Sequence, residues 1–408
     1  MFYCVYKKEI VFMKVTFSKK KLMAALTPAA GISQTKNTYA SCDGLLFECP
    51  PDKRFGDYDL GNPDLCRISV FDFEKGLRTT IECTVHEKGM CVIHTQSILQ
   101  IVRALPDGEI TMDIDANGGA VLSGGKVNVR ISAGPGETFP TMPMFIGTKS
   151  FRIAQYRLRR VLSETVFAVA QNDLLRMGFN GGLLRIKGNE LIIVGCDNHK
   201  LAASCCTVSP SDVESEDTEI LIPGKFLSEL HRLLSDTEDE IIMILGRKHA
   251  IFHLGPIYFF TRILETGYPD YEKMLPSAYT TEAFLSRTEL LEAVERASII
   301  ADAKVGGGTG TYIKLEFMNN TVVVSSVSSG GAIDETLRAA VNGPDLAIEF
   351  ESRNLLDTLK ACPADCEWLR LRLNSPLMGM RIDPYDEYEE EKRFMYFVLP
   401  TRMNIPLK

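Results

Sequence analysis

The segment Asp197-Asn198-His199-Lys200 holds the side chains best suited to catalysis, because it places an imidazole close to a carboxylate and an amine. A histidine near an aspartate is an arrangement that a general base can use. The chain has only six histidines, and no nucleophile or oxyanion donor can be identified beside this one. An enzyme with an unrecognised site around His199 therefore remains a rival interpretation.

Other segments contain residue types that bind phosphate or metal ions. The glycine-rich run from Gly306 to Gly310 lacks the Lys-Ser/Thr that follows a phosphate-binding loop, so we expect a hairpin or inter-strand loop. The acidic tract from Asp383 to Lys392 is expected to be a solvated loop before the last strand. The eleven cysteines contain no Cys-x-x-Cys pair, which favours buried free thiols over zinc ligands. We expect no cofactor and no metal.

Three copies of one design organise the chain. Each copy begins with a short strand that runs into a helix, with equivalent apolar residues at i, i+5 and i+9. The equivalent sets are Phe17, Ile153 and Leu285, then Leu22, Leu158 and Leu290, then Leu26, Leu162 and Val294. A second helix repeats around Val102, Leu230 and Leu359. We predict domains at residues 13–147, 148–278 and 279–408, with residues 1–12 as an N-terminal extension.

Strand patterns dominate between the predicted helices. Apolar and β-branched runs at residues 44–49, 109–114, 183–187, 191–194, 240–245, 312–317, 322–325 and 369–373 are separated by turn signals. The order is strand, helix, several antiparallel strands, helix and several strands. It predicts an α+β fold of three tandem repeats, each with two helices on one side of an antiparallel sheet.

Composition is typical of a soluble protein, with 45% hydrophobic and 24% charged residues. No apolar run approaches the roughly 20 residues that a membrane span needs. The first twelve residues place charges inside their apolar stretch and do not read as a signal peptide. We expect a cytoplasmic protein without a membrane partner.

Basic residues gather on the repeated helices although the net charge is −8. A positive helical face on an acidic protein would suit a phosphate backbone, without reading bases. Simple solvation of exposed helix faces by Lys and Arg explains the same pattern, so both interpretations stay open.

Several motifs resemble the bacterial sliding clamp, the DNA polymerase III beta subunit family, over about residues 13–403. They are Met13-Lys-Val-Thr-Phe, Phe179-Asn-Gly followed by Cys196-Asp-Asn-His-Lys-Leu, Gly267-Tyr-Pro-Asp-Tyr-Glu-Lys-Met-Leu-Pro and Tyr396-Phe-Val-Leu-Pro-Thr-Arg. The resemblance implies a head-to-tail homodimer ring, the DNA clamp fold, that encircles duplex DNA. It implies a non-catalytic processivity factor of the DNA-directed DNA polymerase, a nucleotidyltransferase. The implied partners are DNA, the replicative polymerase catalytic subunit, the clamp loader and other proteins with clamp-binding motifs.

The resemblance also implies three sets of functional residues. A pocket for partner peptides would be formed by Phe179, Cys196, Asn198, His199, Lys200, Leu201, Pro269, Lys273, Met274, Leu377, Gly379, Val398, Leu399, Pro400, Thr401, Arg402 and Met403. DNA would face Lys19, Lys20, Lys36, Arg103, Arg157, Lys225, Arg232, Arg353 and Lys360. The dimer interface would include Val129, Arg296, Ile299 and Ile300.

Departures from the family pattern affect the pocket. Lys200 stands where the family often has arginine, and a lysine gives no bidentate guanidinium contact. We expect Lys200 on the exposed rim, near Asn354. The tail of residues 404–408 is expected to lie close to the pocket and to compete with the peptide. A repeat-built interaction scaffold that never encircles DNA is the remaining alternative.

Overall fold

Burial alternates along the strand that opens the first repeat. In the computed structural model, β1 (Met13–Ser18) buries Met13, Val15 and Phe17 on one face, as the period of two in a strand requires. The structure describes residues 13–32, 43–50, 64–115, 118–142, 149–210, 217–303, 312–385 and 394–401. The chain divides into two compact units, Met1–Ser150 with Glu240–Arg262 and Phe151–Asp239 with Ile263–Lys408.

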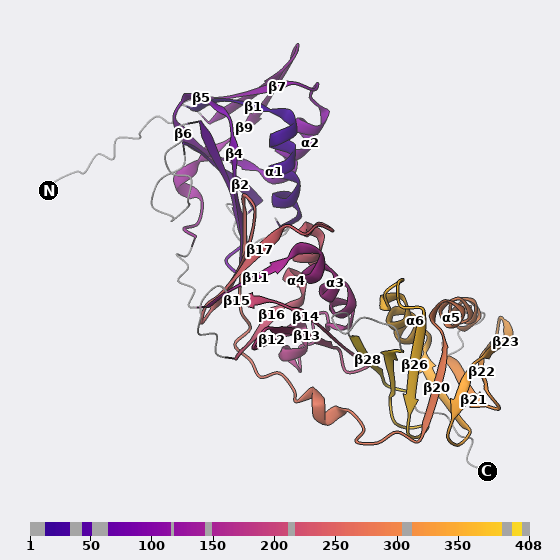
Figure 1. Cartoon of the computed structure of the whole chain (residues 1–408). Coiled ribbons are helices and arrows are strands. Elements are labelled where there is room, and N and C mark those ends of the chain that lie inside the picture. The colour runs from indigo at the N-terminus through magenta and orange to yellow at the C-terminus, as the bar shows by residue number, and fades with distance from the viewer. Residues whose placement is uncertain are drawn as a thin grey trace. The chain divides into compact units, whose positions relative to one another are not determined.

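The first unit contains a pair of helices and two sheets. Its elements are β1, α1 (Lys19–Ile32), β2 (Gly44–Cys49), β3 (Leu65–Phe71), β4 (Lys75–Glu82), β5 (Thr84–Glu87), β6 (Gly89–His94), α2 (Thr95–Ala104), β7 (Glu109–Ile114), β8 (Gly119–Gly124), β9 (Val127–Ser132), β10 (Gly134–Pro135), η3 (Gly136–Thr138), β17 (Glu240–Leu245), β18 (His249–Leu254) and β19 (Ile257–Arg262). One sheet has the order β5-β1-β7-β8-β9, and β10-β6-β2-β3-β4-β19-β18-β17 are consecutive strands of a second sheet. The helices α1 and α2 pack against each other (Figure 1).

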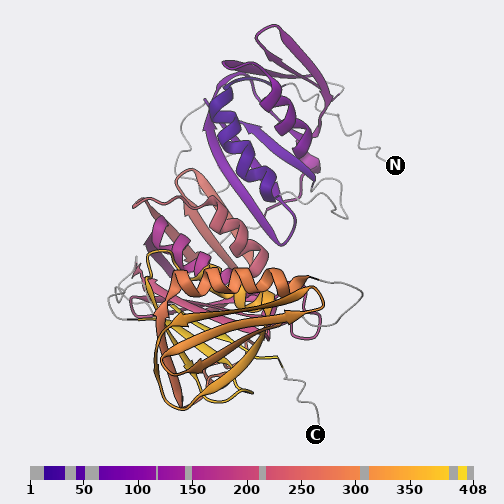
Figure 2. The same ribbon diagram turned by 90° about the vertical axis from the view of Figure 1, so that its right-hand side faces the viewer.

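The second unit repeats this architecture. Its elements are β11 (Lys149–Ala154), α3 (Gln155–Thr165), η4 (Val166–Ala168), η5 (Met177–Asn180), β12 (Gly181–Lys187), β13 (Glu190–Cys196), β14 (Lys200–Thr207), β15 (Ser209–Pro210), β16 (Thr218–Pro223), α4 (Gly224–Leu233), η6 (Tyr271–Met274), β20 (Thr281–Ser286), α5 (Arg287–Asp302), β21 (Tyr312–Met318), β22 (Thr321–Ser328), β23 (Gly331–Arg338), β24 (Ala340–Asn342), β25 (Leu346–Glu351), α6 (Ser352–Ala361), β26 (Trp368–Leu373), β27 (Met380–Pro384) and β28 (Phe394–Val398). One sheet has the order β16-β12-β13-β14-β28-β27-β26-β20-β24, and another has the order β23-β22-β21-β25. Figure 2 shows α5 alongside strands of the latter sheet, against which it packs.

The repeated apolar positions occupy equivalent places in the core. Phe17, Ile153 and Leu285 are buried in the opening strands, and Leu22, Leu158 and Leu290 are buried in the helices that follow. The second helices likewise bury Val102, Leu230 and Leu359. The predicted α+β repeat fold is therefore confirmed, and the predicted helices and strand runs lie in helices and strands of the structure.

A serine side chain ends the strand and starts the helix in the third repeat. Ser286 is the N-cap of α5, and its hydroxyl accepts the Glu289 N–H at 3.4 Å. Such a cap satisfies one of the free N–H groups of the first turn. None of the described helices has the length and apolar character that crossing a membrane requires.

Candidate functional site

The predicted peptide surface is built where three strands of one sheet end together. β14, β28 and β27 are neighbours, with Lys200 opposite Val398 and Val398 opposite Met380. The Leu399 N–H donates to the His199 carbonyl oxygen at 2.8 Å. This register brings predicted residues of the second and third repeats to one end of a single sheet.

A tight turn positions His199 at that end. Asn198 has φ of 76°, in the left-handed region that asparagine tolerates better than most residues. One oxygen of the Asp197 carboxylate accepts the N–H groups of His199 and Lys200, each at 2.9 Å. Asp197 therefore shapes the turn through backbone hydrogen bonds, and Asn198 and His199 remain exposed.

Several predicted pocket residues form the floor of this region. Phe179, Cys196 and Leu201 belong to one buried cluster that also contains Tyr271 and Phe397. Val398 is also buried, in the core around the third repeat. A Cβ atom on Gly379 would lie 2.4 Å from the Phe397 ring, so glycine is needed there for the strand to approach the ring. These residues support the surface from below, and we correct the expectation that Leu201 and Val398 are available as peptide contacts.

The other predicted pocket residues differ in how far they are exposed. Leu377, in the loop before β27, is 73% exposed. Met274 and Leu399 are also exposed, whereas Pro269, Pro400 and Thr401 are partly buried. Lys273 is exposed and pairs with Asp270 at 2.8 Å. Met378, beside Leu377, is exposed as well and was not among the predicted residues.

Lys200 corrects another expectation, because it does not lie on an exposed rim. Its side chain is only 8% exposed, and its Nζ lies 2.9 Å from the Asp197 carboxylate. Nζ also donates to the Asn354 side-chain oxygen at 3.2 Å. Asn354 in turn donates to the Glu351 carboxylate at 2.9 Å. Lys200 is therefore part of a polar network that links β14 to α6.

Five predicted features lie outside the described residues. They are the N-terminal extension of residues 1–12, the pocket residues Arg402 and Met403, the tail of residues 404–408, the helix-flanking Lys36 and the glycine run from Gly306 to Gly310. The acidic tract is described only at its start, through Asp383 and the two residues after it. Asp383 is not in a solvated loop: it lies in β27 and accepts hydrogen bonds from Arg372 at 2.6 Å and Arg381 at 2.9 Å.

An exposed apolar loop beside Phe179 was missed at the sequence level. Leu174, Leu175 and Met177 are all largely exposed. The Asp173 carboxylate accepts the N–H groups of Leu175 and Arg176 at 3.0 and 2.8 Å, so the loop has a defined shape. The dipeptide Asn172-Asp173 followed by apolar residues was the available signal.

Burial favours the neutral forms of two titratable groups beneath the predicted peptide surface, Cys196 and Tyr268. Burial raises the pKa of the Cys196 thiol, which makes it a poor nucleophile. Burial also raises the pKa of Tyr268, whose hydroxyl donates to the Val194 carbonyl at 3.3 Å. Within the described residues, no group of three or more His, Cys, Asp or Glu side chains could hold a metal ion.

Glu164, near the end of α3, is a buried carboxyl group outside the predicted peptide surface. Burial raises its pKa to about 7, although Arg160 and the Ser204 hydroxyl favour the ionised form. Arg160 lies 3.2 Å from the carboxylate, and Ser204 donates to it. A carboxyl with this pKa changes charge near neutral pH.

The predicted DNA-facing residues differ in their exposure and in the groups that their side chains contact. Lys20, Arg103, Lys225, Arg232, Arg353 and Lys360 lie on the exposed faces of the helices that carry them. Lys360 pairs with Glu295 at 3.2 Å, and Arg353 lies 3.8 Å from Asp357. Lys19 is mostly buried: its Nζ donates to the Leu105 carbonyl and contacts Asp107. Lys19 therefore uses its charge inside the first unit. In the second unit, the Arg157 Nε donates to the Tyr156 hydroxyl at 2.8 Å.

The predicted dimer residues lie at or near edge strands. Val129 is in β9, and β9 and β23 are each the last strand of their sheets in the described part of the chain. Ile299 is exposed at the end of α5, and the Ile300 side chain lies near Gly331 at the start of β23. Arg296 donates to both oxygens of Glu335 at 2.7 and 2.8 Å, which lowers the pKa of Glu335.

Known proteins resemble this chain in both sequence and fold. Residues 152–270 match the central domain of the DNA polymerase III beta subunit, and residues 272–402 match its C-terminal domain. The beta sliding clamp of Staphylococcus epidermidis is 29% identical over 283 residues, which is 69% of this chain and 73% of that protein. The sliding clamp of Bacillus subtilis superposes with a TM-score of 0.85 at 22% identity, covering 96% of this chain and 99% of that one. The Pseudomonas aeruginosa clamp bound to griselimycin gives 0.83 at 25% identity, covering 96% of this chain and 100% of that one.

Proposed function

This chain belongs to the bacterial sliding clamp family, the beta subunits of DNA polymerase III, and from this premise we propose that two copies form a ring around duplex DNA. The ring is a processivity factor that tethers the replicative polymerase and other replication and repair proteins during strand elongation. It is a non-catalytic subunit, and the polymerase performs the chemistry. Tethering acts by raising the local concentration of each partner at the DNA.

The repeated helix pair carries this proposal. Each repeat packs two helices together, and basic side chains such as Lys20, Lys225 and Lys360 stay exposed on them. Phosphate contacts of this kind are independent of base sequence, individually weak and sensitive to salt. They would hold the ring near the duplex while permitting it to slide.

Ring closure requires a second copy, because three repeats supply half of a six-domain ring. We assign the repeats to residues 13–147, 148–278 and 279–408. The edge strand β9, with Val129, would meet the edge strand β23 of the other copy, beside Ile299 and Ile300 of α5. Unpaired strand edges readily add a further strand, and an exposed isoleucine supplies apolar area to bury.

Partner proteins, including the polymerase catalytic subunit and the clamp loader, would bind through the surface around Leu377, Met274 and Leu399. An exposed apolar centre next to His199 and Lys273 suits a short hydrophobic peptide with a polar flank. We place the protein in the cytoplasm, where replication partners are found.

Retention on closed DNA tests the ring. Protein loaded on nicked circular duplex should stay bound through a high-salt wash, and cutting the circle once should release it. Binding that is lost equally from circular and linear DNA would contradict encirclement and favour a scaffold that binds DNA laterally or not at all. The matched control is the same circle without a clamp loader, on which no wash-resistant protein should accumulate.

A further inference from the structure

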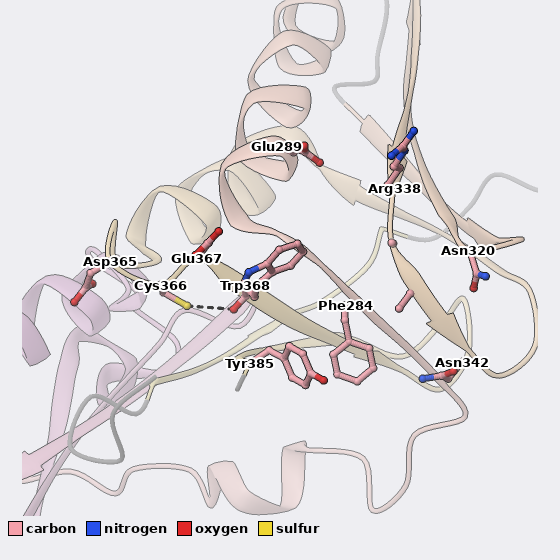
Figure 3. A pocket seen from close by; sticks show the side chains of 12 residues that line it. Phe284, Glu289, Asn320, Arg338, Asn342, Asp365, Cys366, Glu367, Trp368 and Tyr385 are labelled. Atoms are coloured by element: carbon pink, nitrogen blue, oxygen red, sulfur yellow. Dashed lines mark hydrogen bonds between the residues drawn. The ribbon is translucent and has the colours of Figure 1, made fainter. Parts of the chain in front are cut away.

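A groove of about 1090 Å³ lies on the third repeat, away from the surface around Leu377. Its aromatic lining consists of Phe284, Trp368 and Tyr385 (Figure 3). Trp368 opens β26, whereas Leu377 lies in the loop beyond the other end of that strand. At about 3.3 Å per residue, the strand from Trp368 to Leu373 is about 16 Å long, and it separates the two residues. The groove is therefore a different site from the peptide surface described above.

Trp368 is the only tryptophan of the chain, and it is 47% exposed. Its backbone is held on two sides. Trp368 pairs with Ser286 at the end of β20, and its carbonyl accepts the Tyr385 N–H at 3.0 Å. The preceding Glu367 carbonyl accepts the Arg287 N–H at 2.9 Å. The strand thus presents a large aromatic ring to solvent from a fixed position, which is a costly arrangement unless a partner covers the ring.

The aromatic floor continues from Trp368 along β20. The Phe284 and Tyr385 ring centroids are 4.3 Å apart. Phe284 faces Ala340 across the β20–β24 pair, and Ala339 and Ala340 both line the groove. Small side chains at this edge leave room for an apolar group against the two rings.

Charge is distributed unevenly around the groove. Glu289, Asp365 and Glu367 come from the first turn of α5 and the loop before β26, on the side of Trp368 (Figure 3). Arg338 and Asn320 stand on the opposite side, at β23 and the turn before β22 (Figure 3). Carboxylates next to an exposed tryptophan favour a cation, because the ring face and the carboxylates attract it together.

Backbone N–H groups at the strand edge beside the groove already have hydrogen-bond acceptors within the chain. β24 is the last strand of its sheet, but the Val341 N–H donates to the Asn320 side-chain oxygen at 3.4 Å. The Ala339 N–H donates to the Asn320 carbonyl at 3.1 Å. A ligand would therefore be recognised mainly through side chains entering the groove and less through strand addition.

We propose that this groove binds a short basic segment of a partner protein. A Lys or Arg side chain of the segment packs on Trp368 between Glu289 and Glu367, and a neighbouring aliphatic or aromatic side chain packs on Phe284 and Tyr385. The inference goes beyond the proposed function and does not depend on ring formation.

Titration of the full chain with two peptides tests the proposal. The basic probe is acetyl-Gly-Arg-Leu-Lys-Phe-Gly-amide, and the acidic probe has Glu in place of Arg and Lys. Neither contains tryptophan, so emission at the tryptophan wavelength reports Trp368 alone. The basic peptide should give a saturable change with a dissociation constant on the order of 100 μM at low salt, as for a small contact area. The acidic peptide should give no saturable change.

Two variants locate the binding by anisotropy of a labelled basic peptide. Glu289→Gln with Glu367→Gln should weaken binding about fivefold to tenfold, and Trp368→Leu, which keeps an apolar side chain, about fivefold. The matched control, Glu238→Gln with Glu265→Gln, removes the same charge from two exposed carboxylates outside the groove and should bind as the parent does.

Equal weakening in the control would show that bulk charge attracts the peptide, and would overturn the proposal. Equal binding of the acidic peptide, or no saturable change with the basic one, would overturn it as well. Sedimentation with and without the basic peptide completes the test. The mass should stay the same, and dissociation of the assembly by the peptide would mean that a second copy of this chain, not a partner, occupies the groove.

Discussion

The Lys200 side chain is nearly buried, and its Nζ contacts the Asp197 carboxylate and donates to the Asn354 side-chain oxygen. Lys200→Ala leaves both acceptors without that donor. We expect the free energy of unfolding to fall by about 2 kcal/mol, because buried polar groups that lose their partner keep their desolvation cost. Chemical denaturation measures the change. Lys273→Ala, in an exposed pair with Asp270, should leave the free energy of unfolding nearly unchanged because solvent screens such a pair, and equal effects of the two substitutions would contradict the network.

Glu164 gives stability a defined pH dependence. Its pKa is raised to about 7 in the folded chain from an ordinary value of 4.5, so its neutral form favours folding. That contribution is complete below about pH 4.5 and is lost as the pH rises through 7. Glu164→Gln cannot ionise. Relative to the parent, the variant should therefore gain about 2–3 kcal/mol between pH 5 and pH 8, which is the part of the pKa shift that falls within this range when converted at about 1.4 kcal/mol per unit.

Denaturant titrations of both proteins at the two pH values provide the measurement for Glu164. The control is Glu238→Gln, an exposed carboxylate, whose difference from the parent should not change over this pH range. A difference for Glu164→Gln that is the same at both pH values would mean that the carboxyl titrates as it does in the unfolded chain.

Leu377 and Leu201 separate peptide contact from support of the fold. Leu377 is exposed, so Leu377→Ala should leave stability nearly unchanged and weaken a hydrophobic partner peptide by about 1–2 kcal/mol. Leu201 is buried, so Leu201→Ala should lower the free energy of unfolding by about 2–5 kcal/mol. Isothermal titration and denaturation of both variants test this division. Unchanged affinity in Leu377→Ala would place the partner elsewhere.

The candidate site could be predicted from sequence only in part, for reasons that particular residues make clear. The resemblance to the clamp family predicted which segments would gather near the turn around His199. It did not reveal that Lys200 is buried, because its acceptor Asn354 lies 154 positions away along the chain. Exposure of Leu377 and burial of Leu201 also depend on which strands become neighbours, and periodicity alone does not specify that.

At the scale of elements, the strand-to-helix repeats were predictable because their cores depend on local spacing. Leu22, Leu158 and Leu290 are buried at the same step of each helix. The pairing of β19 with β4 was not predictable, since it joins Ile257 to Thr79 across distant segments. Strand patterns indicate which face is buried but do not identify the partner strand.

The end of α5 and the edge strand β23 make the proposed dimer testable. Ile299 is exposed in one chain, so Ile299→Asp should leave the folded chain intact. In a dimer it would bury a carboxylate, and we expect association to weaken by about 2–4 kcal/mol. Sedimentation at micromolar concentration should find about 90 kDa for the parent, from two chains of 45.4 kDa, and mostly monomer for the variant. Leu377→Asp, the control, should remain dimeric.

At the scale of the whole molecule, the net charge of −8 opposes binding to DNA, so any attraction must come from a local arrangement of basic residues. Neutralising five exposed helix residues should remove up to five phosphate contacts. The slope of log K against log salt on short linear duplex should then become shallower by up to about 4.5, at about 0.9 per contact. The substituted residues are Lys20, Arg103, Lys225, Arg353 and Lys360, each changed to alanine.

A second variant with the same net charge separates a positive helical face from bulk charge. It replaces five exposed lysines outside the helices α1 to α6 with alanine: Lys88, Lys126, Lys187, Lys248 and Lys273. Both variants have a formal charge five units more negative than −8. The helix variant should lose the salt-dependent binding, and the second should keep the parent's slope apart from a general weakening. Equal slopes in the two variants would mean that the helices only solvate their exposed faces. Encirclement depends on closure of the ring and not on these contacts. The helix variant, once loaded on a circle, should therefore still resist a high-salt wash, and it should leave when the circle is cut.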